Sequence, residues 1–106
     1  MTEQGTEYQV TYWRDLPSLV AARAGEQVTK SPLTSRFQEA IDEAAMRLGE
    51  TGSDDYLAGW RRSEWTSVPG STTEVADRVA SQLEQEWPAE RLQEYLDALG
   101  PSKENP

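Results

Sequence analysis

The sequence contains no histidine and no cysteine, and these two absences exclude more chemistry than any residue that is present. Without an imidazole, the chain has no side chain whose ordinary pKa suits proton transfer near neutral pH. Without thiolates it has no cysteine nucleophile and no disulfide scaffold, and zinc and haem lose their usual ligands. The sequence therefore predicts no catalytic residue and no cofactor, and it favours a non-catalytic protein.

Long apolar runs are also missing. No stretch approaches the roughly 20 apolar residues that a membrane-spanning helix needs. The first residues, MTEQGTEY, lack the basic and apolar segments of a secretory signal. We therefore expect a soluble cytoplasmic protein with no membrane partner.

Basic residues are scarce, because 10 Lys and Arg face 19 Asp and Glu for a net charge of -9. Such a chain repels phosphate backbones, so we expect no nucleic-acid partner. Most of the net negative charge lies in residues 63–106, which sum to -6 because few basic residues accompany their acids. A solvated helical surface explains them most simply, and a docking face for a basic partner is the alternative.

The length of 106 residues suits one domain with a single core. The polar residues 1–7 and the turn-forming residues 100–106 predict disordered ends. Residues 8–99 are then a single α+β domain.

A β-meander is predicted over residues 8–30. Tyr8, Val10 and Tyr12 alternate with polar residues and form one face of a strand, with Trp13 on the other face. Turn-forming residues follow at 15–18, and the apolar run at 19–23 predicts a second strand. Gly25 suits a hairpin turn, after which residues 27–29 predict a third strand.

Four helices are predicted after the meander, at about residues 33–48, 53–60, 72–87 and 88–99, from apolar residues at helical spacing. Gly49 suits the end of the first helix and Ser53 the N-cap of the second. Ser71 with Glu74 forms a capping box, and Pro88 suits the first turn of the last helix. The expected architecture is a small antiparallel meander packed against three to four helices.

Two segments place tryptophan directly before arginine, one at the end of a predicted strand and one at the end of a predicted helix. Arginine stacks on aromatic faces and forks onto carboxylates or phosphates. We expect these side chains to face outward as a binding surface; the alternative is that the indoles are core and that the arginines pair with Asp15 or Asp55. The predicted binding residues are Trp13, Arg14, Asp15, Tyr56, Trp60, Arg61 and Arg62.

Other polar clusters give no chemical signal. Asp54 and Asp55 with Asp42 and Glu43 lack the ligand spacing of a calcium loop, and helix capping and solvation explain them. Ser18, Ser53 and Ser67 have no histidine and no obvious lysine beside them to act as base, so a serine nucleophile is not expected. We predict no metal site.

Three ordered blocks resemble a bacterial family known as virulence factor, and also the C-terminal part of the larger conserved virulence factor C proteins. They are VTYWRDLPS at residues 10–18, RFQEAIDEAAMR at 36–47 and SDDYLAGWRR at 53–62. The resemblance implies a cytoplasmic domain, found alone or appended to a larger scaffold, with no established reaction. The sequence KSPLTS at residues 30–35 replaces an expected Leu-Pro start, which leaves the first helix boundary open.

Two functions follow as hypotheses. The first is a protein-interaction domain that docks on a larger enzyme or scaffold through exposed aromatic and arginine side chains. The alternative is a small-molecule site, in which the arginines bind an anion and Trp13, Trp60 or Tyr12 stacks on a flat ring such as a pterin or nucleotide base, as in an accessory subunit of one-carbon metabolism. Arginines converging on an open cleft would favour the second.

Overall fold

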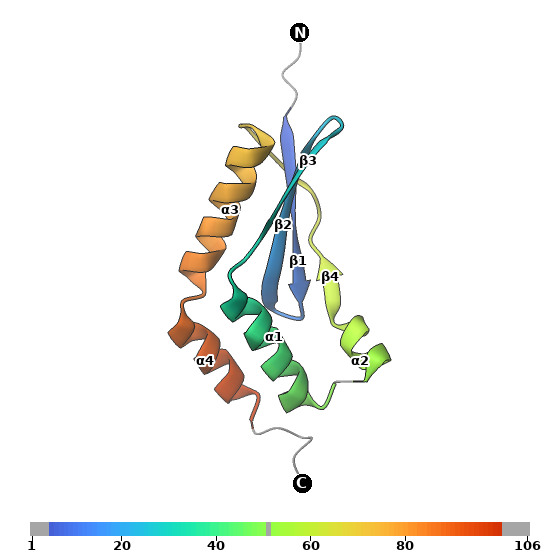
Figure 1. The fold of residues 1–106 in the computed structure, drawn as a ribbon, viewed down its shortest axis with the longest axis vertical. Coiled ribbons are helices and arrows are strands. Elements are labelled where there is room, and N and C mark those ends of the chain that lie inside the picture. The colour runs from blue at the N-terminus through green and yellow to red at the C-terminus, as the bar shows by residue number, and fades with distance from the viewer. Residues whose placement is uncertain (1–4, 51, 101–106) are drawn as a thin grey trace.

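The computed structural model describes residues 5–50 and 52–100, which form a five-stranded antiparallel sheet and, within those residues, four helices (Figure 1). The strands β1 to β3 come first, and most of the helical sequence follows them. The α+β class predicted from the sequence is confirmed.

The meander consists of β1 (Thr6–Trp13), β2 (Leu16–Ala24) and β3 (Gln27–Pro32). Arg14 and Asp15 connect the first two strands, and Gly25 with Glu26 connects the next two. Gly25 has a φ of 60°, which a hairpin turn of two residues requires. Two strands are longer than predicted. β2 starts within the predicted turn, and β1 includes the buried Thr6, which lies in the segment predicted to be a disordered end.

Trp13 lies in the core, so the prediction that it faces outward was wrong. The β1–β2 register shifts between Thr11 and Tyr12, an irregularity that breaks the simple alternation of sides. Val10 and Trp13 are consequently both buried although they are three residues apart. Trp13 pairs with Leu16, and both side chains are fully buried.

Two short strands, β4 (Trp60–Arg62) and β5 (Thr66–Val68), return to opposite ends of β1. β4 pairs with Thr11–Trp13, and β5 pairs with Thr6–Tyr8. Between them, Ser63 donates its backbone N–H to the Val10 carbonyl and accepts the Val10 N–H on its hydroxyl. The strand order is therefore β3, β2, β1 and then β4, with β5 beside β1.

The helices are α1 (Ser35–Leu48), α2 (Ser53–Ala58), α3 (Thr72–Glu86) and α4 (Ala89–Ala98). Gly49 ends α1 in the left-handed conformation, and the capping box of Ser71 and Glu74 starts α3, as predicted. Gly52, rather than the predicted Ser53, occupies the N-cap position of α2. Pro88 likewise precedes α4 as its N-cap instead of lying in its first turn.

The helices cover only one face of the sheet. α3 packs along β2 and β3, α1 packs on β2, and α4 packs on α1 (Figure 1). The core between these layers includes Val10, Trp13, Leu16, Val20, Phe37, Ile41, Val75, Leu83, Leu92 and Leu96. On the opposite face, the side chains are half-buried or exposed; they include Glu7, Gln9, Thr11, Leu19, Ala21, Arg23, Val28 and Lys30.

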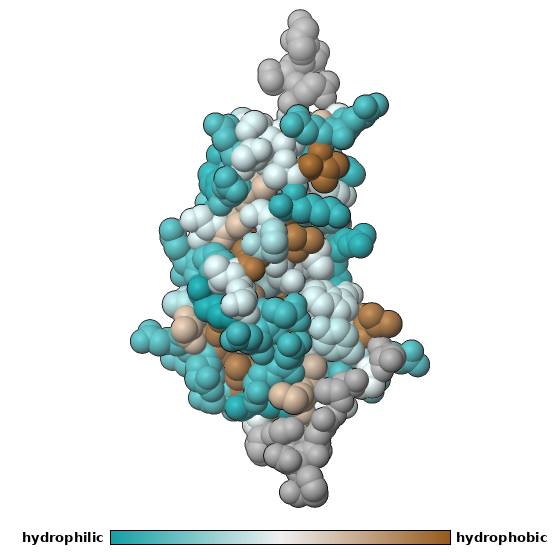
Figure 2. All heavy atoms as spheres, in the orientation of Figure 1, coloured by the Kyte–Doolittle hydropathy of each residue, from teal (hydrophilic) through white to brown (hydrophobic). Residues whose placement is uncertain are grey.

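Charge is distributed unevenly between the two layers. The helices α1, α3 and α4 carry ten acidic and four basic side chains, whereas the five strands carry one acidic and four basic side chains. Figure 2 shows hydrophilic residues over much of one side of the molecule, with only small hydrophobic areas between them. The strand layer is therefore the positive side of an acidic protein.

Among residues 5–50 and 52–100, no helix combines the length and the apolar character that crossing a lipid bilayer demands.

Candidate binding site at the end of the first hairpin

The turn between β1 and β2 meets the junction of α2 and β4. The Arg14 N–H donates to the Gly59 carbonyl at 2.8 Å, and Arg61 Nε donates to the Arg14 carbonyl at 3.0 Å. These bonds bring together segments that are more than 40 residues apart in the sequence. They form a cleft of about 440 Å³, the hairpin-end cleft, lined by Arg14, Asp15, Leu48, Ala58, Gly59, Arg61, Tyr95 and Leu99.

The Arg14 side chain is fixed by an ion pair within the chain. Its φ of 53° is unusual for a residue other than glycine, and its guanidinium forms a two-pronged ion pair with Glu50. The hydrogen bond and the charge of Glu50 raise the pKa of Arg14. The acid is neither Asp15 nor Asp55, the two partners considered from sequence. Arg14 lines the cleft, but its charge is already compensated.

Asp15 accepts a hydrogen bond from the Tyr95 hydroxyl at 3.2 Å. Burial raises the pKa of Tyr95, and the negative charge and hydrogen bond of Asp15 raise it further. Tyr95 also packs edge-on against Trp87, with ring centroids 5.8 Å apart. Tyr95 is not among the predicted binding residues, and no local sequence signal indicates that it reaches Asp15, 80 positions away.

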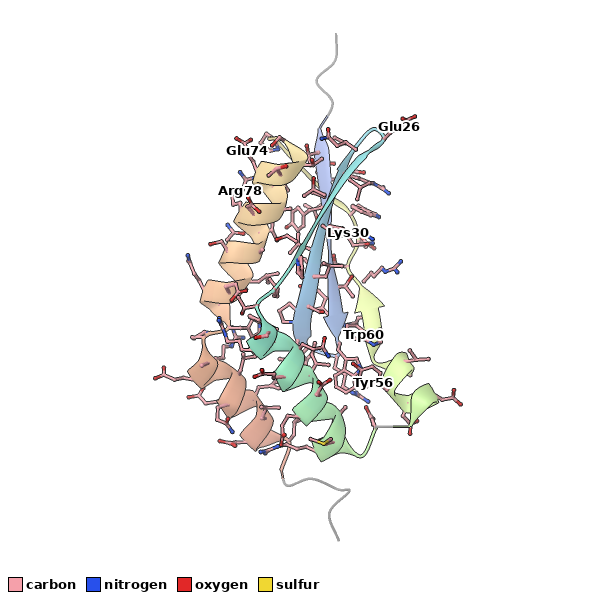
Figure 3. The ribbon with its side chains drawn as sticks, viewed as in Figure 1. Glu26, Lys30, Tyr56, Trp60, Glu74 and Arg78 are labelled. Carbon is pink, nitrogen blue, oxygen red and sulfur yellow. The ribbon has the colours of Figure 1, made fainter. Side chains whose placement is uncertain are left out.

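A row of three aromatic rings supports this end of the sheet. Trp13 donates its indole N–H to the Tyr56 carbonyl at 2.8 Å and stacks on the Tyr56 ring. Tyr56 in turn meets Trp60 edge-on at 5.9 Å (Figure 3). Trp13 is thus beneath the surface, while Tyr56 and Trp60 are half-buried. Only the last two remain within reach of a binding partner.

Arg61 lines two hollows, one shared with Arg14 and one shared with Arg62. Arg61 lies over the Tyr12 ring at 4.4 Å and lines the hairpin-end cleft. Arg62, opposite Thr11, lines a separate hollow of about 490 Å³ with Thr11, Trp60 and Arg61. Within the described residues, no acid is within ion-pair distance of either arginine. The three predicted arginines therefore do not converge on one cleft.

Leu57 extends this exposed region onto α2. Its side chain is 63% exposed, which is unusual for a large apolar residue, and it precedes Trp60 by about one helical turn. We call Leu57, Trp60, Arg61 and Arg62 the β4 surface. Its tryptophan and arginines are among the predicted binding residues, whereas Leu57 is not.

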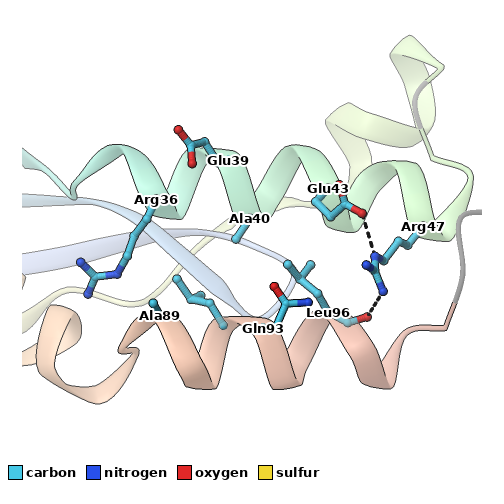
Figure 4. Close-up of a pocket in the computed structure, with 9 residues that line it drawn as sticks. Arg36, Glu39, Ala40, Glu43, Arg47, Ala89, Gln93 and Leu96 are labelled. Carbon is cyan, nitrogen blue, oxygen red and sulfur yellow. Dashed lines mark hydrogen bonds and ion pairs between the residues drawn. The ribbon is translucent and has the colours of Figure 1, made fainter.

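A third concave region lies between α1 and α4 (Figure 4). It measures about 430 Å³, and Ala40, Leu92 and Leu96 lie at its base. Arg47 at its rim bonds to Glu43 at 2.8 Å and to the Leu96 carbonyl at 2.9 Å. The first bond lies within α1 and the second joins α1 to α4, so the Arg47 guanidinium is already engaged and the groove offers less free binding capacity than the β4 surface.

The described residues contain no group of three or more acidic side chains placed to hold a metal ion. Fold and site together define a small α+β domain with a sheet covered on one face and a basic, aromatic surface at β4. The chain belongs to the virulence factor family, which it matches over residues 11–96, from β1 to α4. No curated protein and no solved structure matches it.

Proposed function

We propose that this chain is a non-catalytic interaction domain that docks through the β4 surface on an acidic region of a larger protein. The observation that carries the proposal is the pair Arg61 and Arg62, which lack acidic partners among the described residues and follow the exposed Leu57 by four and five positions in the chain. A surface of this composition is typical of interfaces.

The β4 surface contains the residue types that dominate binding energy. Tryptophan and arginine are enriched among the few interface residues that matter most. Burying a leucine side chain fully contributes about 1.5–3 kcal/mol, and the β4 surface leaves Leu57 available for that gain. Arg61 and Arg62 would fork onto carboxylates of the partner, which supplies specificity as well as affinity.

The charge distribution supports an acidic partner and also restricts how it approaches. The acidic helices α1, α3 and α4 would repel such a partner, whereas the basic strands would attract it. Complementary charge mainly speeds association and selects orientation. Docking should consequently be fast at low ionic strength and weaken as salt increases.

The test is affinity capture from the native cell extract with three versions of the chain: wild type, the double variant Arg61→Ala with Arg62→Ala, and the control Arg78→Ala. Arg78 is an exposed arginine on α3 whose described polar contact is one bond of 3.3 Å to the Pro69 carbonyl. A protein captured by wild type and Arg78→Ala but not by the double variant, and then shown to bind directly in purified form, is the expected result. Equal capture by all three, or a wild-type chain recovered monomeric and without any partner, would contradict the proposal.

A second candidate function is binding of a small anionic ligand in the hairpin-end cleft. The observation in its favour is that Arg14 and Arg61 line one open cleft with Tyr95. Two findings weigh against it: Arg14 is already paired with Glu50, and Trp13 is too deeply buried to stack on a ligand ring. Thermal shift with pterin and nucleotide ligands tests it, and a stabilisation that is lost in Arg61→Ala but kept in Arg78→Ala would support it.

A further inference from the structure

The strand β3 forms one edge of the sheet. It pairs with β2 on one side, and no strand of residues 5–50 and 52–100 pairs with it on the other. At six residues, it is twice as long as β4, which lies at the opposite edge. An uncovered edge of this length is a template for another strand.

The register shows which backbone groups of β3 are free. Ala24 opposes Gln27 across the hairpin turn of two residues, and the Leu33 N–H donates to the Ser18 carbonyl. In an antiparallel ladder, hydrogen-bonded and non-hydrogen-bonded pairs alternate, so the odd-numbered residues of β3 bond to β2. The N–H and C=O groups of Val28 and Lys30 therefore point to the free side.

The side chains along this edge are exposed and charged in a symmetrical order. Val28 is 55% exposed, and Glu26 and Lys30 are exposed two residues before and after it (Figure 3). Neither Glu26 nor Lys30 has an opposite charge within ion-pair distance in the described part of the chain. The edge strand and the turn that precedes it thus carry an acid at 26, an apolar residue at 28 and a base at 30.

We propose that β3 pairs antiparallel with β3 of a second copy of this chain, about a two-fold axis at Val28. In this register the two β3 strands pair over residues 27–29 with Val28 opposite Val28 of the second copy, and Lys30 faces Glu26 in the hairpin turn of the second copy. The two-fold axis repeats the second contact, so each dimer gains two opposite-charge pairs. Opposite charges directly across an antiparallel pair stabilise it, and like charges destabilise it.

The same charges disfavour the neighbouring registers. An axis at Lys30 would place two lysines opposite each other, and an axis at Thr29 would place each lysine opposite a valine. Lysine and proline on an edge strand usually prevent pairing. Here Lys30 instead selects the one register in which Glu26 compensates it. The β4 surface lies at the other edge of the sheet, so this inference does not depend on the proposed function.

Disulfide crosslinking tests the register directly, because the chain has no cysteine of its own. Directly opposed residues of a hydrogen-bonded pair have Cα atoms about 5.5 Å apart, within the range that a disulfide bridges. Val28→Cys should therefore form a covalent dimer with itself under mild oxidation. Lys30→Cys is the matched control, since two copies of residue 30 would lie four positions out of register, about 13 Å apart.

Charge exchange tests the same contact without a covalent bond. Sedimentation of the full chain at increasing concentration should show a monomer–dimer equilibrium. Glu26→Lys should shift it toward monomer, and Glu26→Lys combined with Lys30→Glu should restore the dimer. A wild-type chain that stays monomeric even at millimolar concentration, or Lys30→Cys crosslinking as readily as Val28→Cys, would overturn the proposal.

Discussion

Trp13 and Gly59 are in such close contact that position 59 accepts no side chain. A Cβ added to Gly59 would lie 2.5 Å from Trp13 Nε1 and 2.6 Å from Trp13 Cε2. The indole cannot move away, since it is fully buried and bonded to the Tyr56 carbonyl. Because Gly59 has an ordinary helical φ of -77°, the requirement for glycine is purely steric.

We therefore expect Gly59→Ala to lower the free energy of unfolding by about 1–3 kcal/mol, the usual cost of overpacking. The measurement is urea unfolding followed by tryptophan fluorescence. Gly52→Ala is the control, because its Cβ would meet no atom closer than 3.9 Å. Equal stability of the two variants would show that the Trp13 contact is not tight.

Tyr95, which lines the hairpin-end cleft, makes the stability of the fold depend on pH in the alkaline range. Its pKa is raised from 10.0 in the folded protein by burial and by Asp15, so the folded state holds the phenol proton more tightly than the unfolded state. The contribution of Tyr95 to stability is fully present below about pH 10 and decreases as pH rises through the folded-state pKa. Asp15→Asn should lower that pKa.

Ultraviolet titration of the phenolate checks this expectation. Tyr95 should ionise at a higher pH than an ordinary tyrosine, and Tyr95→Phe should remove that late component. Unfolding by urea, repeated at several alkaline pH values, should show a shallower loss of stability in Tyr95→Phe than in wild type. A titration unchanged by Tyr95→Phe would refute the assignment.

At the scale of elements, α3 depends on its capping box. Ser71 accepts a hydrogen bond from the Glu74 N–H, and the Glu74 carboxylate accepts one from the Ser71 N–H, both at 3.1 Å. Ser71→Ala should therefore lower the unfolding free energy by about 1 kcal/mol. Ser81→Ala, on an exposed position inside the same helix, should leave it unchanged or raise it slightly. Chemical denaturation compares them, and equal values would mean that the cap contributes nothing.

The helices and the meander could be predicted from sequence because their signals are local: apolar periodicity, glycine at a turn and a capping box. β4 could not be predicted, because three residues are too few to show an alternation of apolar and polar side chains. Its pairing with β1 also depends on residues about 50 positions away. The register shift that buries Trp13 lies within the first hairpin, and the alternation of residue types along the strand does not reveal it.

The candidate site was predictable only in part. Adjacent pairs such as Trp60 and Arg61 marked its location. Glu50, which pairs with Arg14, lies just after α1, and Tyr95, which bonds to Asp15, lies in the last turn of α4. Both are far from the first hairpin in the sequence, so no local signal marks them. Sequence spacing also could not show that Arg62 faces a different hollow from Arg14.

At the scale of the whole molecule, the excess of acid on α1, α3 and α4 should reduce stability at low ionic strength. We expect added sodium chloride to raise the melting temperature, because screening of like charges outweighs the loss of surface ion pairs that are worth about 0–1 kcal/mol each. Glu94→Gln relieves repulsion from Glu90 one turn earlier and should stabilise the chain by about 0.2–0.5 kcal/mol at low salt only. Thermal unfolding at several salt concentrations measures both, and a melting temperature that falls with salt would contradict the expectation.

The position of β1 between β2 on one side and β4 with β5 on the other has a consequence for synthesis on the ribosome. The first hairpin can form as soon as it is made, but one flank of β1 waits for residues 60–68. Until then the Trp13 indole lacks Tyr56 and Gly59, which later cover it. The nascent chain therefore completes its sheet late. Bringing β1 together with β4 and β5 across the intervening residues 14–59 costs conformational entropy before the contacts between these strands compensate it.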